Sequence, residues 1–72
     1  MVPKVRAVRE VEWTEVGGFR AIVLTVDGDW VTYTHHPNGG WCRWGYADKP
    51  TVFIGAEEVP PEVMARFSTA VN

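Results

Sequence analysis

The chain has 72 residues, 46% of them hydrophobic, and a formal net charge of −2. A chain of this length forms one small domain, residues 1–72, that buries only ~60% of the surface its unfolded form exposes. Cys42 is the only cysteine, which excludes a disulfide within the chain and predicts a buried free thiol. The acidic balance argues against a general nucleic-acid binder, because such domains usually carry a strong basic excess.

We expect no signal peptide at the start of the chain. Its first residues run directly into mixed charge, without the apolar core of a signal peptide. No stretch of the sequence approaches the ~20 consecutive apolar residues that a membrane-spanning helix needs. We therefore expect a cytoplasmic protein that does not use a membrane.

Five segments rich in β-branched and aromatic residues predict five strands. Turn residues separate these segments, above all Asp27-Gly28 and Asn38-Gly39, which are strong hairpin signals because a type I′ turn needs positive φ at both central positions. Short connections between neighbouring strands favour an antiparallel meander. The predicted strands are Val5–Trp13, Phe19–Val26, Trp30–His36, Trp41–Tyr46 and Thr51–Ile54.

The end of the chain predicts one helix, from Pro60 or Pro61 to Ala70. Proline suits the first helical position, where its missing N–H would have no partner in any case. One apolar stripe follows the helical rhythm, and its members are Val63, Met64, Phe67 and Val71. The predicted fold class is therefore α+β, a four- to five-stranded antiparallel meander with one C-terminal helix packed on a face.

Two-residue turns at Asp27-Gly28 and Asn38-Gly39 set a register, and cross-strand partners share a face. The face expected to pack on the helix is nearly all apolar and carries Ile22, Leu24, Val26, Val31, Tyr33, Cys42, Trp44 and Tyr46. The opposite face is mixed and carries Ala21, Val23, Thr25, Trp30, Thr32, Thr34, His36, Trp41 and Arg43. A slip of one residue in the second hairpin would bring Trp41 and Arg43 inward, which predicts a poorer core.

The first and last predicted strands are compatible with either an open sheet or a closed barrel. Thr51–Ile54 is apolar on both sides, and the Gly17-Gly18 loop can hold a bulge. If these strands curl over the mixed face, the sheet closes into a small SH3-like barrel and Trp30 becomes part of the core. Otherwise the sheet stays open.

No catalytic or metal-binding motif stands out. Zinc accepts the side chains of His35, His36, Cys42 and Asp48, but adjacent histidines on a strand point to opposite faces and a second cysteine is missing. A Cys42–His35 pair across two strands resembles a thiol activated by a base, but a buried thiol is a poor nucleophile. We therefore expect a protein that is not an enzyme and holds no cofactor and no metal.

The mixed face suggests a binding surface, because tryptophan and arginine are enriched at binding hot spots. The predicted binding residues are Trp30, Trp41, Arg43, Thr32, Thr34 and His36. We interpret the chain as a small interaction module for an unidentified protein partner. Small size, acidity and missing catalytic residues are typical of phage-encoded inhibitors of host or defence proteins. In the structural alternative, the two tryptophans pack beneath the terminal strands of a closed sheet.

The sequence is also compatible with two other classes of function, nucleic-acid binding and self-association. In a small-barrel nucleic-acid binder, basic residues would meet phosphates while Trp30 and Trp41 stack on bases. The basic residues in question are Lys4, Arg6, Arg9 and Arg43. In a self-associating protein, an exposed edge strand or the tryptophan-bearing face would form a symmetric homodimer.

Overall fold

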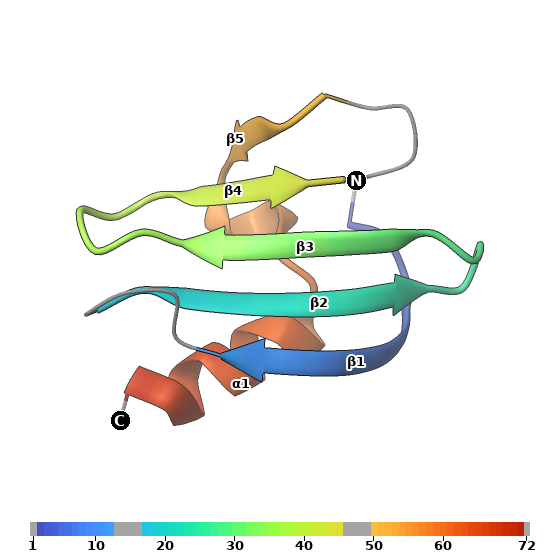
Figure 1. Ribbon diagram of the computed structural model, residues 1–72, viewed down its shortest axis with the longest axis horizontal. Helices are drawn as coiled ribbons and strands as arrows, with labels where there is room; N and C mark the ends of the chain where they lie inside the picture. Colours follow the sequence, from blue (N-terminus) through green and yellow to red (C-terminus); the bar gives the residue numbers. More distant parts are fainter. Residues whose placement is uncertain (1, 13–16, 46–49, 72) are drawn as a thin grey trace.

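The computed structural model describes residues 2–12, 17–45 and 50–71, with the backbone alone at positions 10, 12 and 71. Five strands are followed by a short 3₁₀-helix and one α-helix (Figure 1). Their bounds are β1 Val5–Glu12, β2 Phe19–Thr25, β3 Trp30–His35, β4 Trp41–Trp44, β5 Val52–Ile54, η1 Ala56–Glu58 and α1 Pro61–Val71. The predicted α+β meander is confirmed, with ends that agree within two residues. Trp13 and Tyr46, predicted as strand ends, lie outside the described residues.

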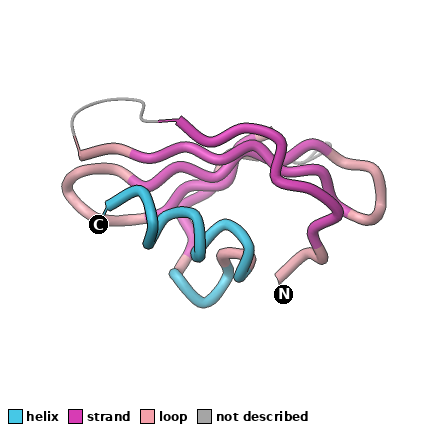
Figure 2. The backbone as a smooth tube through the Cα atoms, turned by 90° about the horizontal axis from the view of Figure 1, so that it is seen from below, coloured by secondary structure: helices cyan, strands magenta, loops and turns pink. Residues whose placement is uncertain are grey.

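The five strands form one open antiparallel sheet in the order β1-β2-β3-β4-β5. Both helices of the described residues lie on the same side of this sheet, so neither of them covers its other side (Figures 1 and 2). The sheet ends at β1 and at β5, and the alternative of a closed barrel is therefore wrong. No helix in the described part of the chain is long and apolar enough to cross a membrane.

Both central hairpins turn through three residues rather than two. In the first, the N–H of Thr25 donates to the carbonyl of Asp29 (2.9 Å) and the N–H of Gly28 donates to the carbonyl of Thr25 (3.0 Å). In the second, the N–H of His36 donates to the carbonyl of Gly40 (3.2 Å). The third loop residue of each is a glycine at positive φ, Gly28 at +92° and Gly39 at +84°. This is the common three-residue hairpin, a type I turn followed by a left-handed residue.

The extra loop residue shifts each hairpin by one position, so the predicted register was wrong. Val23 pairs with Val31 across β2 and β3, and Thr34 pairs with Cys42 across β3 and β4. A shift of one residue exchanges the two faces of a strand. The helix side of the sheet therefore receives Val31 and Tyr33 of β3 as predicted, but the opposite sets of side chains from β2 and β4.

The second hairpin contained the signal that excludes a two-residue turn. With Asn38-Gly39 alone in the loop, Pro37 would flank the turn and would have to donate an N–H to Gly40, which proline lacks. At the first central position of a type I turn, in contrast, proline is favoured. The structure places Pro37 there, between His36 and Asn38.

The core lies between the sheet and α1. Its buried hydrophobic residues are Phe19, Ala21, Val23, Val31, Tyr33, Trp41, Val59 and Val63. Three aromatic rings meet edge to face within it, with ring centroids 5.3 Å apart for Phe19 and Phe67, 5.1 Å for Trp41 and Phe67, and 6.0 Å for Phe19 and Trp41. Such contacts add to the stability gained from buried area alone. The arrangement that the sequence pattern ranked as poorer is therefore stabilised by Phe67, a residue of the helix.

Candidate binding face

The sheet surface opposite the helices is hereafter called the helix-free face. Cross-strand pairs define it, because partners share a face. Leu24 pairs with Trp30, Thr32 pairs with Trp44, and Cys42 pairs with Phe53. The members of the helix-free face from β2 to β5 are Arg20, Ile22, Leu24, Trp30, Thr32, Thr34, Cys42, Trp44 and Phe53.

Three large aromatic side chains of the helix-free face are exposed to solvent. The exposed fractions are 43% for Trp30, 42% for Trp44 and 83% for Phe53. The helices α1 and η1 lie on the other side of the sheet (Figure 2). A single exposed apolar residue is common on any protein, but several on one face are typical of a surface that another molecule covers.

A cation lies against one of these aromatic rings. The guanidinium carbon of Arg9 is 5.3 Å from the centroid of the Trp30 ring, within the ~6 Å range of cation–π attraction. Arg9 stands at an irregularity of the β1–β2 pairing, between Val8 and Glu10. The helix-free face therefore combines exposed aromatic rings with the positive charge of Arg9 at its β1 side.

A hydrogen-bonded chain of three side chains orders the middle of the face. The indole N–H of Trp44 donates to the hydroxyl oxygen of Thr34 (2.9 Å), and this oxygen lies 3.2 Å from Nε2 of His36. Because Thr34 accepts from Trp44, its own hydroxyl hydrogen is available to an unprotonated Nε2 of His36. These groups line an open hollow of about 420 Å³ together with Arg20 and Thr32. A hollow with one aromatic wall and several polar groups can receive a side chain or a small planar group.

The structure keeps four of the six predicted binding residues together and separates the other two. Trp30, Thr32, Thr34 and His36 lie on or beside the helix-free face. Trp41 is only 5% exposed and belongs to the core. Arg43 pairs with Tyr33 and Val52, and so lies on the helix side of the sheet. The shifted second hairpin is the cause, because it turns both of these β4 residues to the other face.

Sequence reasoning missed Trp44 and Phe53 as members of the exposed surface. Trp44 was assigned to the core because of the same shift, and Pro37 is the signal that would have corrected it. Phe53 lies between Val52 and Ile54 in a segment that is apolar on both sides, so alternation alone does not reveal which side is exposed. Pairing with Cys42 decides the position of Phe53.

The structure does not assemble the metal-binding and thiol arrangements considered from sequence. His35 pairs with Trp41 while Cys42 pairs with Thr34, so His35 and Cys42 lie on opposite faces. Cys42 is a buried free thiol, as predicted. Asp48 lies outside the described residues. Within residues 2–12, 17–45 and 50–71, no group of three or more histidine, cysteine or carboxylate side chains is placed to hold a metal ion.

The chain matches no protein-family model, no curated protein and no solved structure.

Proposed function

We propose that this protein is a small interaction module that binds a protein partner through its helix-free face. The observation that supports the proposal is the exposure of Trp30, Trp44 and Phe53 on the side of the sheet that no helix of the described residues covers. Complete burial of an aromatic side chain removes on the order of 150–250 Å² of its surface from water. A partner that covers these three residues removes the part still exposed, which is about two fifths for each tryptophan and most of the surface for Phe53. A partner with an apolar patch would therefore gain substantial binding free energy from these three residues.

The arrangement matches the composition of protein-binding hot spots, where tryptophan, tyrosine and arginine dominate and polar groups surround them. Arg9 beside Trp30 contributes a cation, and the hollow beside Trp44 accepts a projecting side chain of the partner. The narrower hypothesis is a phage-encoded inhibitor that acts by covering a host or defence protein. Recovery of such a protein as the partner would support that version.

The test is co-purification from a bacterial lysate with four tagged proteins. They are the wild type, Phe53→Ser, a Trp30→Ser/Phe53→Ser double variant, and Val26→Ser. Val26 is 53% exposed in the first hairpin loop, away from the strands of the helix-free face, and is the matched control. We expect one protein to be retained by the wild type and Val26→Ser, to bind Phe53→Ser more weakly, and to be lost with the double variant. Equal recovery by all four would contradict the proposal.

A single-stranded nucleic acid is the second candidate ligand, and one observation favours it. Arg9 over Trp30 is the combination of cation and stacking surface that such binders use, in which each stacked base contributes ~1–3 kcal/mol. The predicted pair of stacking residues, Trp30 and Trp41, does not form, so Trp30, Trp44 and Phe53 take that role in this version. The acidic net charge of −2 ranks it second.

Binding of fluorescent single-stranded DNA and RNA oligonucleotides, titrated with salt, distinguishes the two candidates. A nucleic-acid ligand would bind with an affinity that falls steeply with added salt, because phosphate contacts release counterions. It would also lose affinity on Arg9→Glu and Trp30→Ser. An absence of binding at about 50 mM salt, where electrostatic attraction is strong, would exclude this second candidate.

A further inference from the structure

The charges along the edge strand β1 are complementary to themselves when the strand is reversed. From Lys4 to Glu12 the sequence reads K-V-R-A-V-R-E-V-E. An antiparallel pair of such strands centred on Val8 sets Lys4 opposite Glu12 and Arg6 opposite Glu10. The valines at positions 5 and 11 then face each other, and Val8 faces its own copy. We propose that the protein forms a symmetric homodimer in which the two β1 edges pair in this register and join the sheets.

Other registers match the charges less well. A shift that sets Arg6 opposite Glu12 brings Arg9 against Arg9, and like charges directly opposite destabilise a pair of strands. A shift that sets Arg6 opposite Arg9 places two positive charges opposite each other at two symmetry-related positions, and both pairs repel. The register centred on Val8 creates four opposite-charge pairs by symmetry and no like-charge pair, so charge complementarity selects it.

The backbone of β1 has the same symmetry. Two irregularities in its pairing with β2, between Val5 and Ala7 and between Val8 and Glu10, give the strand a three-residue spacing. The residues at this spacing, Val5, Val8 and Val11, pack against the core. This pattern is symmetric about Val8, so reversing the strand keeps the three valines on the helix side.

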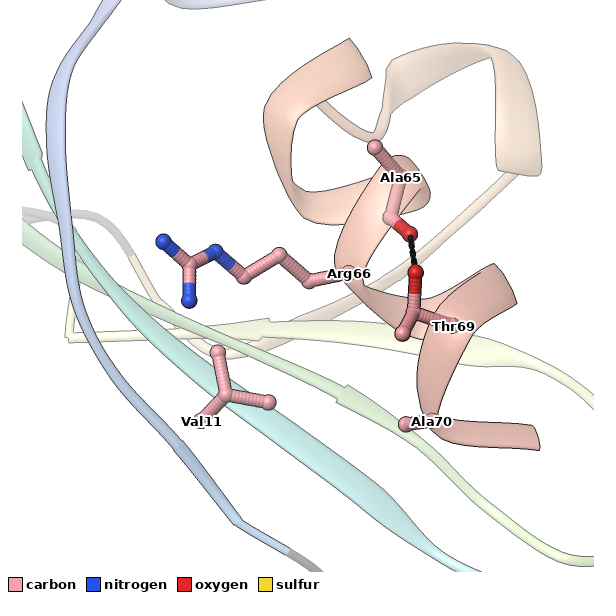
Figure 3. Close-up of a pocket in the computed structure, with 5 residues that line it drawn as sticks. All are labelled: Val11, Ala65, Arg66, Thr69 and Ala70. Carbon is pink, nitrogen blue, oxygen red and sulfur yellow. Dashed lines mark hydrogen bonds between the residues drawn. The ribbon is translucent and has the colours of Figure 1, made fainter. Parts of the chain in front are cut away.

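The helix α1 beside β1 carries a second pair of opposite charges, Arg66 and Glu62. Arg66 extends from α1 across a groove of about 410 Å³ that Val11 borders on the strand side (Figure 3). Glu62 lines a different hollow together with Lys4 and Val5. No ion pair joins Arg66 or Glu62 to another side chain of the described residues. In the proposed register Val11 faces the copy's Val5, which brings Arg66 toward the end of the copy's helix that carries Glu62.

Antiparallel pairing at an edge keeps both copies' helices on the same face of the joined sheet, since paired residues share a face. The groove beside Val11 would then be covered by the second molecule rather than by solvent. Edge strands with free N–H and C=O groups readily accept another strand, and natural proteins protect or pair them. This inference does not depend on the helix-free face, which remains exposed in such a dimer.

The test is sedimentation equilibrium of the wild type, Arg6→Glu, Glu10→Arg and the double variant that carries both changes. Each single reversal replaces two symmetry-related attractions with repulsions, and we expect the dimer dissociation constant to rise by about tenfold or more. The double variant exchanges the two charges and restores the opposite-charge pair, so its dissociation constant should return close to the wild-type value. A Glu57→Arg variant, with a similar charge change outside β1, is the control and should leave dimerisation unchanged.

Circular dichroism and thermal melts of the variants verify that each one folds. A wild-type chain that stays monomeric up to a concentration on the order of 1 mM at low salt would overturn the proposal, and the irregularities of β1 would then act as protection of a free edge. A dimer that ignores the β1 variants but is lost with Phe53→Ser would overturn it as well, because the helix-free face would then be the contact. Loss of dimer in both single variants without recovery in the double variant would refute this register.

Discussion

The two faces of this sheet carry aromatic residues of the same types, but those on one face are buried and those on the other are exposed. On the helix side, Trp41 contacts Phe67 and is almost fully buried. On the helix-free face, Trp30 and Trp44 keep more than two fifths of their surface in water, and Phe53 keeps most of it. Trp41 and Trp44 even share one strand. The residue type therefore does not decide burial here; the alternation of the strand and the length of the preceding loop do.

The aromatic residues of the two faces also differ in what they contribute: those of one face to stability, those of the other to the proposed binding. Aromatic residues on the helix side hold the sheet and the helix together, because their rings fill the space between these two layers. Those on the helix-free face keep 42–83% of their surface in water, so their removal should leave the fold intact and affect binding. Substitutions on the two faces can break or sharpen this distinction.

The largest effect is expected from Trp41→Ala. Removing a buried aromatic side chain typically costs about 3–5 kcal/mol, and Trp41 contacts Phe19, His35 and Phe67. For a domain of this size such a loss approaches the whole free energy of unfolding. The side chain of Trp44 is four tenths exposed, so Trp44→Ala should lower the free energy of unfolding by only about 1–2 kcal/mol. Urea unfolding of both variants measures the difference, and equal losses would contradict the assignment of the two faces.

A smaller effect is expected from Gly39→Ala in the second hairpin. Gly39 has φ of +84°, and the left-handed conformation costs a residue with a Cβ roughly 1–2 kcal/mol. Gly39→Asn should cost less, since asparagine tolerates this region better, and serves as the control. Chemical denaturation gives both values. If alanine and asparagine are tolerated equally, the three-residue loop does not set the register of β4 in the way described.

Thr34→Val tests the polar link on the helix-free face. The hydroxyl of Thr34 accepts from Trp44 and lies beside His36, and a typical hydrogen bond contributes about 1 kcal/mol. We expect a loss of that size and a changed chemical shift of the Trp44 indole N–H in an NMR spectrum. Thr34→Ser keeps the hydroxyl and should preserve the shift. An unchanged indole resonance in Thr34→Val would show that this hydrogen bond is not formed in solution.

The smallest effect is expected from Phe53→Ser, because an exposed side chain outside special structural features usually changes stability by less than ~0.5 kcal/mol. The neighbouring Ile54 pairs with Trp41 on the helix side and packs against the core. Ile54→Ser should therefore cost more than Phe53→Ser. The thermal melts of the two variants measure this contrast, and a reversed order would mean that β5 presents its other face to the core.

Much of the fold could be predicted from local patterns. The strands, their meander order and the C-terminal helix follow from β-branched and aromatic segments, glycine-containing turns and the apolar stripe of the helix, all of which act over a few residues. Val31 and Tyr33 were placed correctly in the core. Trp30, Thr32, Thr34 and His36 were placed correctly on one surface because they alternate along and just beyond a single strand.

The sequence alone therefore determined the elements of this protein, their order and the absence of an internal disulfide. Only the tertiary structure decided which face of β2 is buried, whereas Pro37 already indicated the buried face of β4. One additional residue in a hairpin loop exchanges the faces of a strand. Asp-Gly is compatible with both loop lengths in the first hairpin, whereas Pro37 excludes the shorter loop in the second. In the first hairpin the choice depends on contacts between residues far apart in the chain, such as that between Phe19 of β2 and Phe67 of α1, which buries the Phe19 side of β2 against the helix.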